Sequence, residues 1–410
     1  MNDDGHQPAY RRHQLHSLGL AAAAFAASAP GQSFLISVFV DDFLAGTDLS
    51  RTTFSILYAA GTVISASAMI LLGRVMDRRG LRPSWIIVAA ALAAACGLAS
   101  VATGALTAFL ALALLRTSGQ GSFPLIGTLL VARNFGRRRG QAVALANLGL
   151  TLSSMALPPL TALLIVHTDW RTAYQVLAVV LLIVVLPLGL LVRGGPARAG
   201  SAATNQGDTV AHPAPVRPGR RGLPALPSGL AARLLLILAG PPLISTAVTF
   251  HAVSILAERG VDFLAAGGTV GILGATSALG VVLAGLIVDR LTTRAALLGS
   301  SATVLAATCV LLVPSAVAAY VAFACLGLGM GATGVLNGTI WARTFGTVNL
   351  GRVQGMAQSA TITAAAIAPM IPAVSVALSG SHTAGLLALA LIAVIASAVA
   401  WSLRDPTMVH

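Results

Sequence analysis

The sequence Gly-Arg-Val-Met-Asp-Arg at residues 73–78 returns in outline as Gly-Leu-Ile-Val-Asp-Arg at residues 285–290, 212 positions later. A second pair keeps nearly the same spacing: Ala-Arg-Asn-Phe-Gly at 132–136 returns as Ala-Arg-Thr-Phe-Gly at 342–346, after 210 positions. Similarity at a nearly constant offset indicates a chain built from two related halves. We therefore expect two structural units of the same architecture, one following the other along the chain.

The composition indicates what kind of units these are. Of the 410 residues, 56% are hydrophobic and only 9% are charged, whereas about a quarter of the residues in a soluble domain are charged. A membrane-crossing helix needs roughly 20 apolar residues. The chain is therefore predicted to be a multi-pass membrane protein with about a dozen crossings, which leaves no room for a soluble catalytic domain. We expect it not to be an enzyme.

Twelve apolar stretches divide the chain. They cover residues 18–43, 52–73, 83–104, 106–132, 141–166, 172–192, 231–256, 264–288, 295–314, 316–341, 353–378 and 383–403. The repeat places six of them in each half, so the predicted fold class is an all-α integral membrane protein with two pseudo-symmetric six-helix lobes. We expect lobes at 1–192 and 230–410, joined by a flexible linker at 193–229 that is rich in proline, glycine and arginine.

The arginines predict the orientation. One alternating set of segments between the stretches carries 21 of them and the opposite set carries three, Arg51, Arg171 and Arg259. By the positive-inside rule, both termini are then cytoplasmic, in a bacterial inner or plasma membrane. A cleavable signal peptide in the first stretch is the alternative, but its removal would leave eleven crossings. The four tryptophans fall at predicted helix ends, where we expect them to anchor at the lipid headgroups.

The net charge of +13 does not indicate nucleic-acid binding, because no basic run is interleaved with aromatic residues. The chain has no lysine, which excludes a Walker A or Schiff-base lysine. Its three cysteines form no Cys-x-x-Cys pair and do not cluster with histidines. We expect no cofactor, no metal site and no nucleic-acid partner.

Several motifs resemble the major facilitator superfamily over nearly the whole chain. Residues 73–82, Gly-x-x-x-Asp-Arg-Arg-Gly-Leu-Arg, resemble its loop 2-3 signature, and Arg116-x-x-Gly119-x-Gly121 resembles its helix 4 motif. The Gly-x-x-x-Gly-Pro run of helix 5 that marks drug/proton antiporters is missing. Residues 49–52, 135–140 and 170–171 resemble the monocarboxylate-porter-like branch, although helix 8 lacks the charged residue expected there.

The resemblance implies a gate at the cytoplasmic side. Asp77 would pair with Arg133 at the inner end of helix 4, and Asp289 with Arg343 would mirror this pair less completely. The gate set as a whole is Gly73, Asp77, Arg78, Gly80, Arg133, Asp289, Arg290 and Arg343. The alternative is that these residues only follow the positive-inside rule.

Arg116 lies deep in the fourth stretch, near mid-bilayer, and belongs to neither set of loop arginines. A charge at that depth costs roughly 2.5–3.5 kcal/mol on insertion scales, so a functional role is the default. We expect it to bind an anionic substrate or to take part in coupling, with Gln120, Asp41 or water as its resting partner. The alternative is an arginine held by backbone carbonyls for packing.

Other polar residues share helix faces and are candidates to line a central cavity. They are Ser33, Ser37 and Asp41 in helix 1, Thr249 and His251 in helix 7, Thr333 and Asn337 in helix 10, and Gln358 in helix 11. Each has a simpler interpretation: hydroxyls and amides often join helices, and Asp41 lies near a helix end where water can reach it. His251 can report a proton near neutral pH or serve as a packed structural histidine.

The expected function is secondary active transport of a small organic solute, with an organic anion such as a carboxylate favoured, by rocking of the two lobes. Proton-coupled efflux of amphipathic compounds is the alternative within transporters. A transport-inactive membrane sensor or scaffold is the alternative outside them. The expected partners are the small-molecule substrate, protons as a candidate coupling ion, and the lipid bilayer, with the protein acting as a monomer.

Overall fold

The computed structural model describes residues 7–135, 139–192, 228–345 and 350–403, and within these ranges every regular element is helical. Eleven helical stretches of the described chain are long and apolar enough to cross a membrane. The fourth predicted crossing is not among the eleven and consists of α5 (Ala105–Leu115), the π-helix η2 (Arg116–Ser122) and α6 (Phe123–Asn134). Together they complete the predicted twelve, so the all-helical fold class is confirmed.

The remaining elements of the first lobe follow in chain order. They are α1 (Gln7–Ala27), η1 (Ala29–Gly31), α2 (Ser33–Thr47), α3 (Arg51–Arg79), α4 (Leu81–Ser100), α7 (Arg139–His167), α8 (Trp170–Val180), η3 (Leu181–Val185) and α9 (Leu186–Leu191). The first crossing consists of α1, η1 and α2, because Pro30 interrupts it. Polar N-caps start two others: the side chain of Ser50 accepts from Thr53 in α3, and that of Asp169 accepts from α8.

The second lobe contains the rest. Its elements are α10 (Ser228–Phe250), α11 (Ala252–Ala257), α12 (Phe263–Ile287), η4 (Val288–Arg290), α13 (Thr293–Leu311), α14 (Ala316–Phe345), α15 (Leu350–Ile367), α16 (Met370–Ser379) and α17 (Thr383–Ser402). The seventh crossing is α10 with α11, and the eleventh is α15 with α16. Residues 193–227 of the predicted linker lie outside the described residues, and α10 already begins at Ser228. The lobe boundaries therefore stay a prediction.

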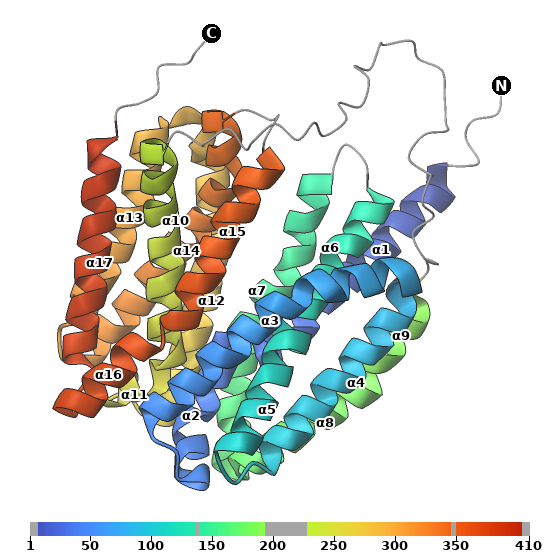
Figure 1. Ribbon diagram of the computed structural model, residues 1–410, viewed down its shortest axis with the longest axis horizontal. Coiled ribbons are helices and arrows are strands. Elements are labelled where there is room, and N and C mark those ends of the chain that lie inside the picture. Colours follow the sequence, from blue (N-terminus) through green and yellow to red (C-terminus); the bar gives the residue numbers. More distant parts are fainter. Residues whose placement is uncertain (1–6, 136–138, 193–227, 346–349, 404–410) are drawn as a thin grey trace.

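Figure 1 shows the two lobes side by side, α1 to α9 on the right and α10 to α17 on the left. The start of α1 and the end of α17 lie at the same end of the molecule, here called the terminal end, and the opposite end is called the distal end. The ribbons of the lobes diverge toward the terminal end. At the distal end α2 and α3 pack against α10, α11 and α16.

Each lobe has its own core. One cluster of buried apolar side chains runs from Leu20 to Val192, with Phe250 of the second lobe added to it, and two further clusters belong to the second lobe. Large apolar side chains such as Ile183, Leu378 and Leu391 are exposed on the outer faces. In water such faces would be a liability, but toward lipid they are favourable.

Two tryptophans correct the prediction of headgroup anchors. Trp85 and Trp341 are fully buried. The indole of Trp85 donates to the Val185 carbonyl at 2.8 Å and packs edge-on against Phe123. Both rings sit near helix ends, as predicted, but they face the helices of their own lobe. Trp401, in contrast, is well exposed.

The seam between the lobes lies in their distal halves. A Cβ added to Gly271 of α12 would stand 2.6 Å from the Met155 carbonyl oxygen of α7, and one added to Gly274 would stand 2.4 Å from the Ser154 hydroxyl. Side-chain-free positions therefore let the two backbones touch. Ser154 and Gly274 lie at the middle of these helices. Gly267, whose added Cβ would stand 2.7 Å from the Ala162 Cβ, continues the contact toward the distal end, so the lobes are joined from mid-helix to that end.

Candidate functional site

Arg116 lies at the start of η2 and its side chain is fully buried. Its Nε donates to the Thr62 hydroxyl at 3.0 Å, and its Nη1 donates to the Gly31 carbonyl at 2.9 Å. The guanidinium carbon stands 4.5 Å from the centre of the Tyr58 ring, so the cation also contacts an aromatic face. Three elements, η1, α3 and η2, thus converge on one charge within the first lobe.

The break in the first crossing explains why a backbone carbonyl is free to bind Arg116. Pro30 has no N–H to give to the Ala26 carbonyl, which accepts from the Ser153 hydroxyl at 3.2 Å instead. In a continuous helix the Leu35 N–H would donate to the Gly31 carbonyl. Here it donates to the Gln32 carbonyl at 3.2 Å. The Gly31 carbonyl therefore lacks its ordinary helical donor and accepts from Arg116.

Two glycines make this convergence possible. A Cβ on Gly31 would stand 2.2 Å from the Leu115 carbonyl oxygen, and one on Gly119 would stand 2.7 Å from the Gly31 Cα. Such separations are far inside van der Waals contact, so only glycine fits at either position. The backbone of η1 therefore lies directly against the π-helix that carries Arg116. Local π-helical turns within α-helices are frequent at functional sites.

Arg116 has no carboxylate among its described partners. Its Nη2 is buried without any hydrogen-bond partner among the described residues. The sequence suggested Gln120 or Asp41 as the resting partner, and the described contacts are to Thr62, Gly31 and Tyr58 instead. Thr62 and Tyr58 are four residues apart on α3 and so share a face, a signal that sequence reasoning could have used.

Tyr58 separates Arg116 from the second lobe. Its ring packs against Phe250 of α10, with centroids 4.3 Å apart, while its other neighbour is the guanidinium. The Tyr58 hydroxyl lies 2.6 Å from the hydroxyl of Ser33, the first residue of α2. Arg116 is thus one side chain away from the surface on which the lobes meet.

The other candidates in helix 1 have different roles in the structure. The Ser37 hydroxyl is buried and donates to the Phe34 carbonyl of its own helix at 2.9 Å. Asp41 forms an ion pair with Arg51, the first residue of α3, at the distal end. Neither residue contacts Arg116.

The candidates in helix 10 make contacts within the second lobe, Thr333 to another helix and Asn337 within its own helix α14. The Thr333 hydroxyl lies 2.6 Å from that of Ser300 in α13. The Asn337 amide oxygen accepts from the Trp341 indole at 2.9 Å. Thr249 of α10 is buried, and the Gln358 side chain lies outside the described side chains.

His251 belongs to a distal network that crosses between the lobes. Arg51 of the first lobe donates to the Ser254 hydroxyl at 3.0 Å and lies 3.4 Å from the His251 Nδ1. The His251 Nε2 stands 2.9 Å from the Pro369 carbonyl, at the break between α15 and α16. Hydropathy could not reveal this grouping, because it joins residues 200 positions apart.

The network continues within the second lobe. The His382 Nδ1 lies 2.6 Å from the Glu258 carboxylate, and its Nε2 lies 3.4 Å from the Ser254 hydroxyl. Burial lowers the pKa of His382 from its usual value, against the opposing effect of the Glu258 carboxylate. Arg259, also buried, donates to the carbonyls of Leu311 and Ile255 and lies 3.8 Å from Glu258.

The gate residues lie at the terminal end, where the structure describes them only in part. The side chains of Asp77 and Asp289 are outside the described ones, so neither predicted ion pair is tested. Gly80 ends α3 with a φ of 87°, a left-handed value that favours glycine. Arg343 donates to the Val288 carbonyl at 3.0 Å. Gly73 lies within α3, Arg133 is half-buried, and Arg78 and Arg290 are exposed.

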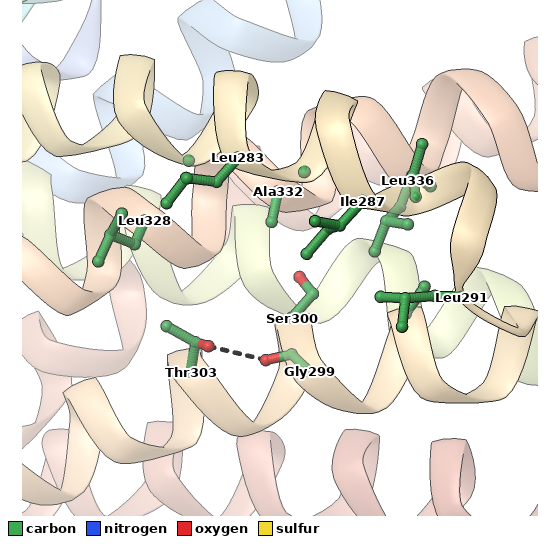
Figure 2. Close-up of a pocket in the computed structure, with 13 residues that line it drawn as sticks. Leu283, Ile287, Leu291, Gly299, Ser300, Thr303, Leu328, Ala332 and Leu336 are labelled. Carbon is green, nitrogen blue, oxygen red and sulfur yellow. Dashed lines mark hydrogen bonds between the residues drawn. The ribbon is translucent and has the colours of Figure 1, made fainter.

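A groove between α12, α13 and α14 is a second place where a molecule could lie (Figure 2). Leu283, Ile287 and Leu291 line it and belong to the exposed apolar surface. The hydroxyl of Ser300 is engaged by Thr333, and that of Thr303 donates to the Gly299 carbonyl at 2.7 Å. With its polar atoms already satisfied, this groove suits lipid chains and not a charged solute.

Two helical lobes joined at one end, with a buried charge in the first lobe close to their interface, are the arrangement expected of a multi-pass membrane transporter. The profile of the Major Facilitator Superfamily matches residues 18–369. The chain therefore belongs to the major facilitator superfamily, as its motifs predicted, and secondary transport by alternating access follows from that membership.

Solved structures share the fold at low identity. A bacterial homolog of the human lysosomal transporter Spinster, in an inward-facing and occupied conformation, superposes with a TM-score of 0.70 at 14% identity, covering 96% of both chains. Its unoccupied form gives 0.69 at 12% identity and 97% of both chains. A D-xylose-proton symporter gives 0.69 at 15% identity, covering 96% of this chain and 97% of its own. No relative was found among curated protein sequences.

Proposed function

We propose that this protein carries a small organic anion, such as a carboxylate, across a bacterial inner membrane. The observation that carries the proposal is the uncompensated charge of Arg116. A buried guanidinium without a counter-ion is unfavourable, and the described residues around it offer a hydroxyl, a carbonyl and a ring but no carboxylate. A carboxylate solute would supply the missing negative charge.

The unpartnered Nη2 gives the expected binding geometry. Nη1 carries two N–H groups and donates one to Gly31, so a carboxylate would bind through the unpartnered Nη2 and would gain a second bond from the remaining N–H of Nη1. Two parallel N–H···O bonds favour planar anions over spherical ones. The same argument explains why the site needs arginine and not lysine.

Access to Arg116 requires a change at the lobe interface. The side chain is fully buried in this conformation, and Tyr58 stands between it and Phe250. When the lobes rock, the Tyr58–Phe250 contact must change, because its two rings belong to different lobes. A swing of Tyr58 away from Ser33 would then open a path to the guanidinium, so solute binding and lobe movement share one side chain.

A melting screen of the purified protein against carboxylates, neutral solutes and cationic amphiphiles tests the proposal, since a ligand stabilises the state that it binds. We expect carboxylates to raise the melting temperature. Arg116→Lys keeps the charge but loses the fork, so its affinity should fall at least about tenfold. Arg259→Lys is the matched control, because it also removes a buried arginine that donates to carbonyls.

Unchanged carboxylate affinity in Arg116→Lys and Arg116→Ala would show that Arg116 only packs the helices. Stabilisation by amphiphiles alone, independent of Arg116, would favour efflux of amphipathic compounds. The candidates in helices 7 and 10 include no arginine, so the bidentate contact to the anion is expected on the first lobe alone.

A further inference from the structure

Arg51 is the one side chain of the first lobe that reaches both His251 and Ser254 among the described contacts, so it fastens the lobes at the distal end. The Asp41 carboxylate pairs with its other terminal nitrogen and holds it in place. A contact of this kind exists only while the distal end is closed, because α3 and α10 lie in different lobes. Opening that end must separate Arg51 from His251.

The partners of His251 determine its protonation state in the closed form. The Pro369 carbonyl, 2.9 Å from Nε2, can only accept, so Nε2 carries a hydrogen. The Arg51 guanidinium, 3.4 Å from Nδ1, can only donate, so Nδ1 must offer its lone pair. The ring is therefore the neutral Nε2–H tautomer.

We propose that His251 is a proton-binding site that is empty while the distal end is closed and is filled when that end opens. A proton on Nδ1 would point an N–H at the N–H of Arg51 and would place two cations side by side in a buried contact. Moving α3 away from α10 removes this repulsion and gives Nδ1 access to water. Because the proton binds better when the distal end is open, a higher proton concentration on the distal side shifts the equilibrium toward the open form.

The other charged groups around the network do not share this property. Asp41 pairs with the other terminal nitrogen of Arg51, and Arg259 is occupied by two carbonyls and Glu258. Burial also disfavours a proton on His382, but Glu258 faces its Nδ1 and the Ser254 oxygen facing its Nε2 can accept, so both N–H groups of the charged ring would keep an acceptor, which Nδ1 of His251 lacks. His251 is therefore the group in this network whose charge opposes closure.

The size of the effect follows from ordinary histidine chemistry. A histidine in water titrates near pH 6.5, so in the open form about nine-tenths of such rings are protonated at about pH 5.5 and about one-tenth at about pH 7.5. If the closed form stays neutral, the ratio of open to closed molecules rises about tenfold between these two pH values. The inference concerns the proton alone and does not depend on the proposed anion.

Spin labels across the distal end measure that ratio without any substrate. Ala45→Cys on α2 and Ser379→Cys on α16 are exposed and lie in different lobes. They are introduced after Cys96, Cys309 and Cys325 are replaced by alanine. Pulsed electron resonance in lipid nanodiscs then gives the populations of short and long label distances at about pH 7.5 and about pH 5.5.

The variants separate a proton site from a packed histidine. His251→Gln keeps a donor for Pro369 but cannot be charged, so we expect its ratio to change less than about twofold with pH. Arg51→Gln removes the repulsion and should also blunt the response. His167→Gln, an exposed histidine that is absent from the network, is the matched control and should respond as the parent does.

A parent protein whose distance distribution does not change with pH would overturn the proposal. So would a His251→Gln variant that keeps the tenfold response, or a response that is lost only in His382→Gln. The outcome is independent of the melting screen, so failure of the anion proposal and failure of this one can be told apart.

Discussion

Arg116 could be singled out from the sequence because it lies deep within an apolar stretch, away from the loops that hold nearly all the other arginines. Its partners could not. The Gly31 carbonyl is free because the first crossing breaks at residues 30–32 and the Leu35 N–H bonds to Gln32 instead, and Tyr58 reaches the guanidinium from another helix. A pattern along one helix does not reveal what faces it from its neighbours.

The close approach of Gly31 and Gly119 gives a prediction at the residue scale. Gly119→Ala would place a methyl group 2.7 Å from the Gly31 Cα, a backbone atom that cannot move alone. Overpacking of this kind costs about 1–3 kcal/mol or more. We expect a clearly lower melting temperature and weaker carboxylate binding.

Gly97→Ala is the control, because an added Cβ there meets nothing within 4 Å and alanine favours the helix. Equal melting temperatures for the two variants would mean that the contact between η1 and η2 is looser than the structure has it.

At the scale of elements, hydropathy predicted the number and rough extent of the crossings but not their interruptions. The first, fourth, sixth, seventh and eleventh crossings each contain a break or a π-helical turn. Those in the first and fourth crossings form the Arg116 site, and those in the seventh and eleventh hold His251 and Pro369. A proline in the sequence indicates that a helix is interrupted, because its backbone N–H is missing. Which other group then donates to the carbonyl left without a partner depends on how the helices pack.

The terminal end of α3 carries Asp77, which the family resemblance assigns to a cytoplasmic gate. If Asp77 pairs with Arg133 as the resemblance implies, Asp77→Asn would remove a charge-assisted bond that forms only when the terminal end is closed. We expect transport to be lost or slowed at least about tenfold while the amount of protein in the membrane stays normal. Uptake of the carboxylate that best stabilises the protein, and the amount of the protein in the membrane, are measured in the same cells.

Asp48→Asn, an exposed acidic residue at the other end of the molecule, is the control. Transport at the parent rate in Asp77→Asn would leave the positive-inside rule as the sufficient explanation for the charges near this end.

On the scale of the whole molecule, the fold followed from the repeat and the composition, because both report on the entire chain. The pseudo-symmetry did not reveal the site, which is asymmetric: the position equivalent to Arg116 is Leu326, a buried core residue. The distal network is also outside the reach of sequence patterns, since it forms only where two lobes meet.

The arginine distribution predicts the orientation of this molecule in the membrane. Reporter enzymes that work only outside the cytoplasm should be active when fused near Thr47 or His382, at the distal end. The same reporters should be inactive near Gly80 or within residues 193–227. An active fusion in that linker would contradict cytoplasmic termini and the predicted two-lobe organisation.

The central claim is that solute crosses only when the distal end can open, and a reversible clamp tests it most directly. The Thr52 hydroxyl donates to the Ala373 carbonyl across the lobes at 3.4 Å, so cysteines at these two positions can be bridged by a short cleavable cross-linker. Uptake of the best-stabilising carboxylate is measured in proteoliposomes, with Thr52→Cys alone as the control. We predict that bridging stops uptake and that reduction restores it; undiminished uptake in the bridged protein would contradict alternating access.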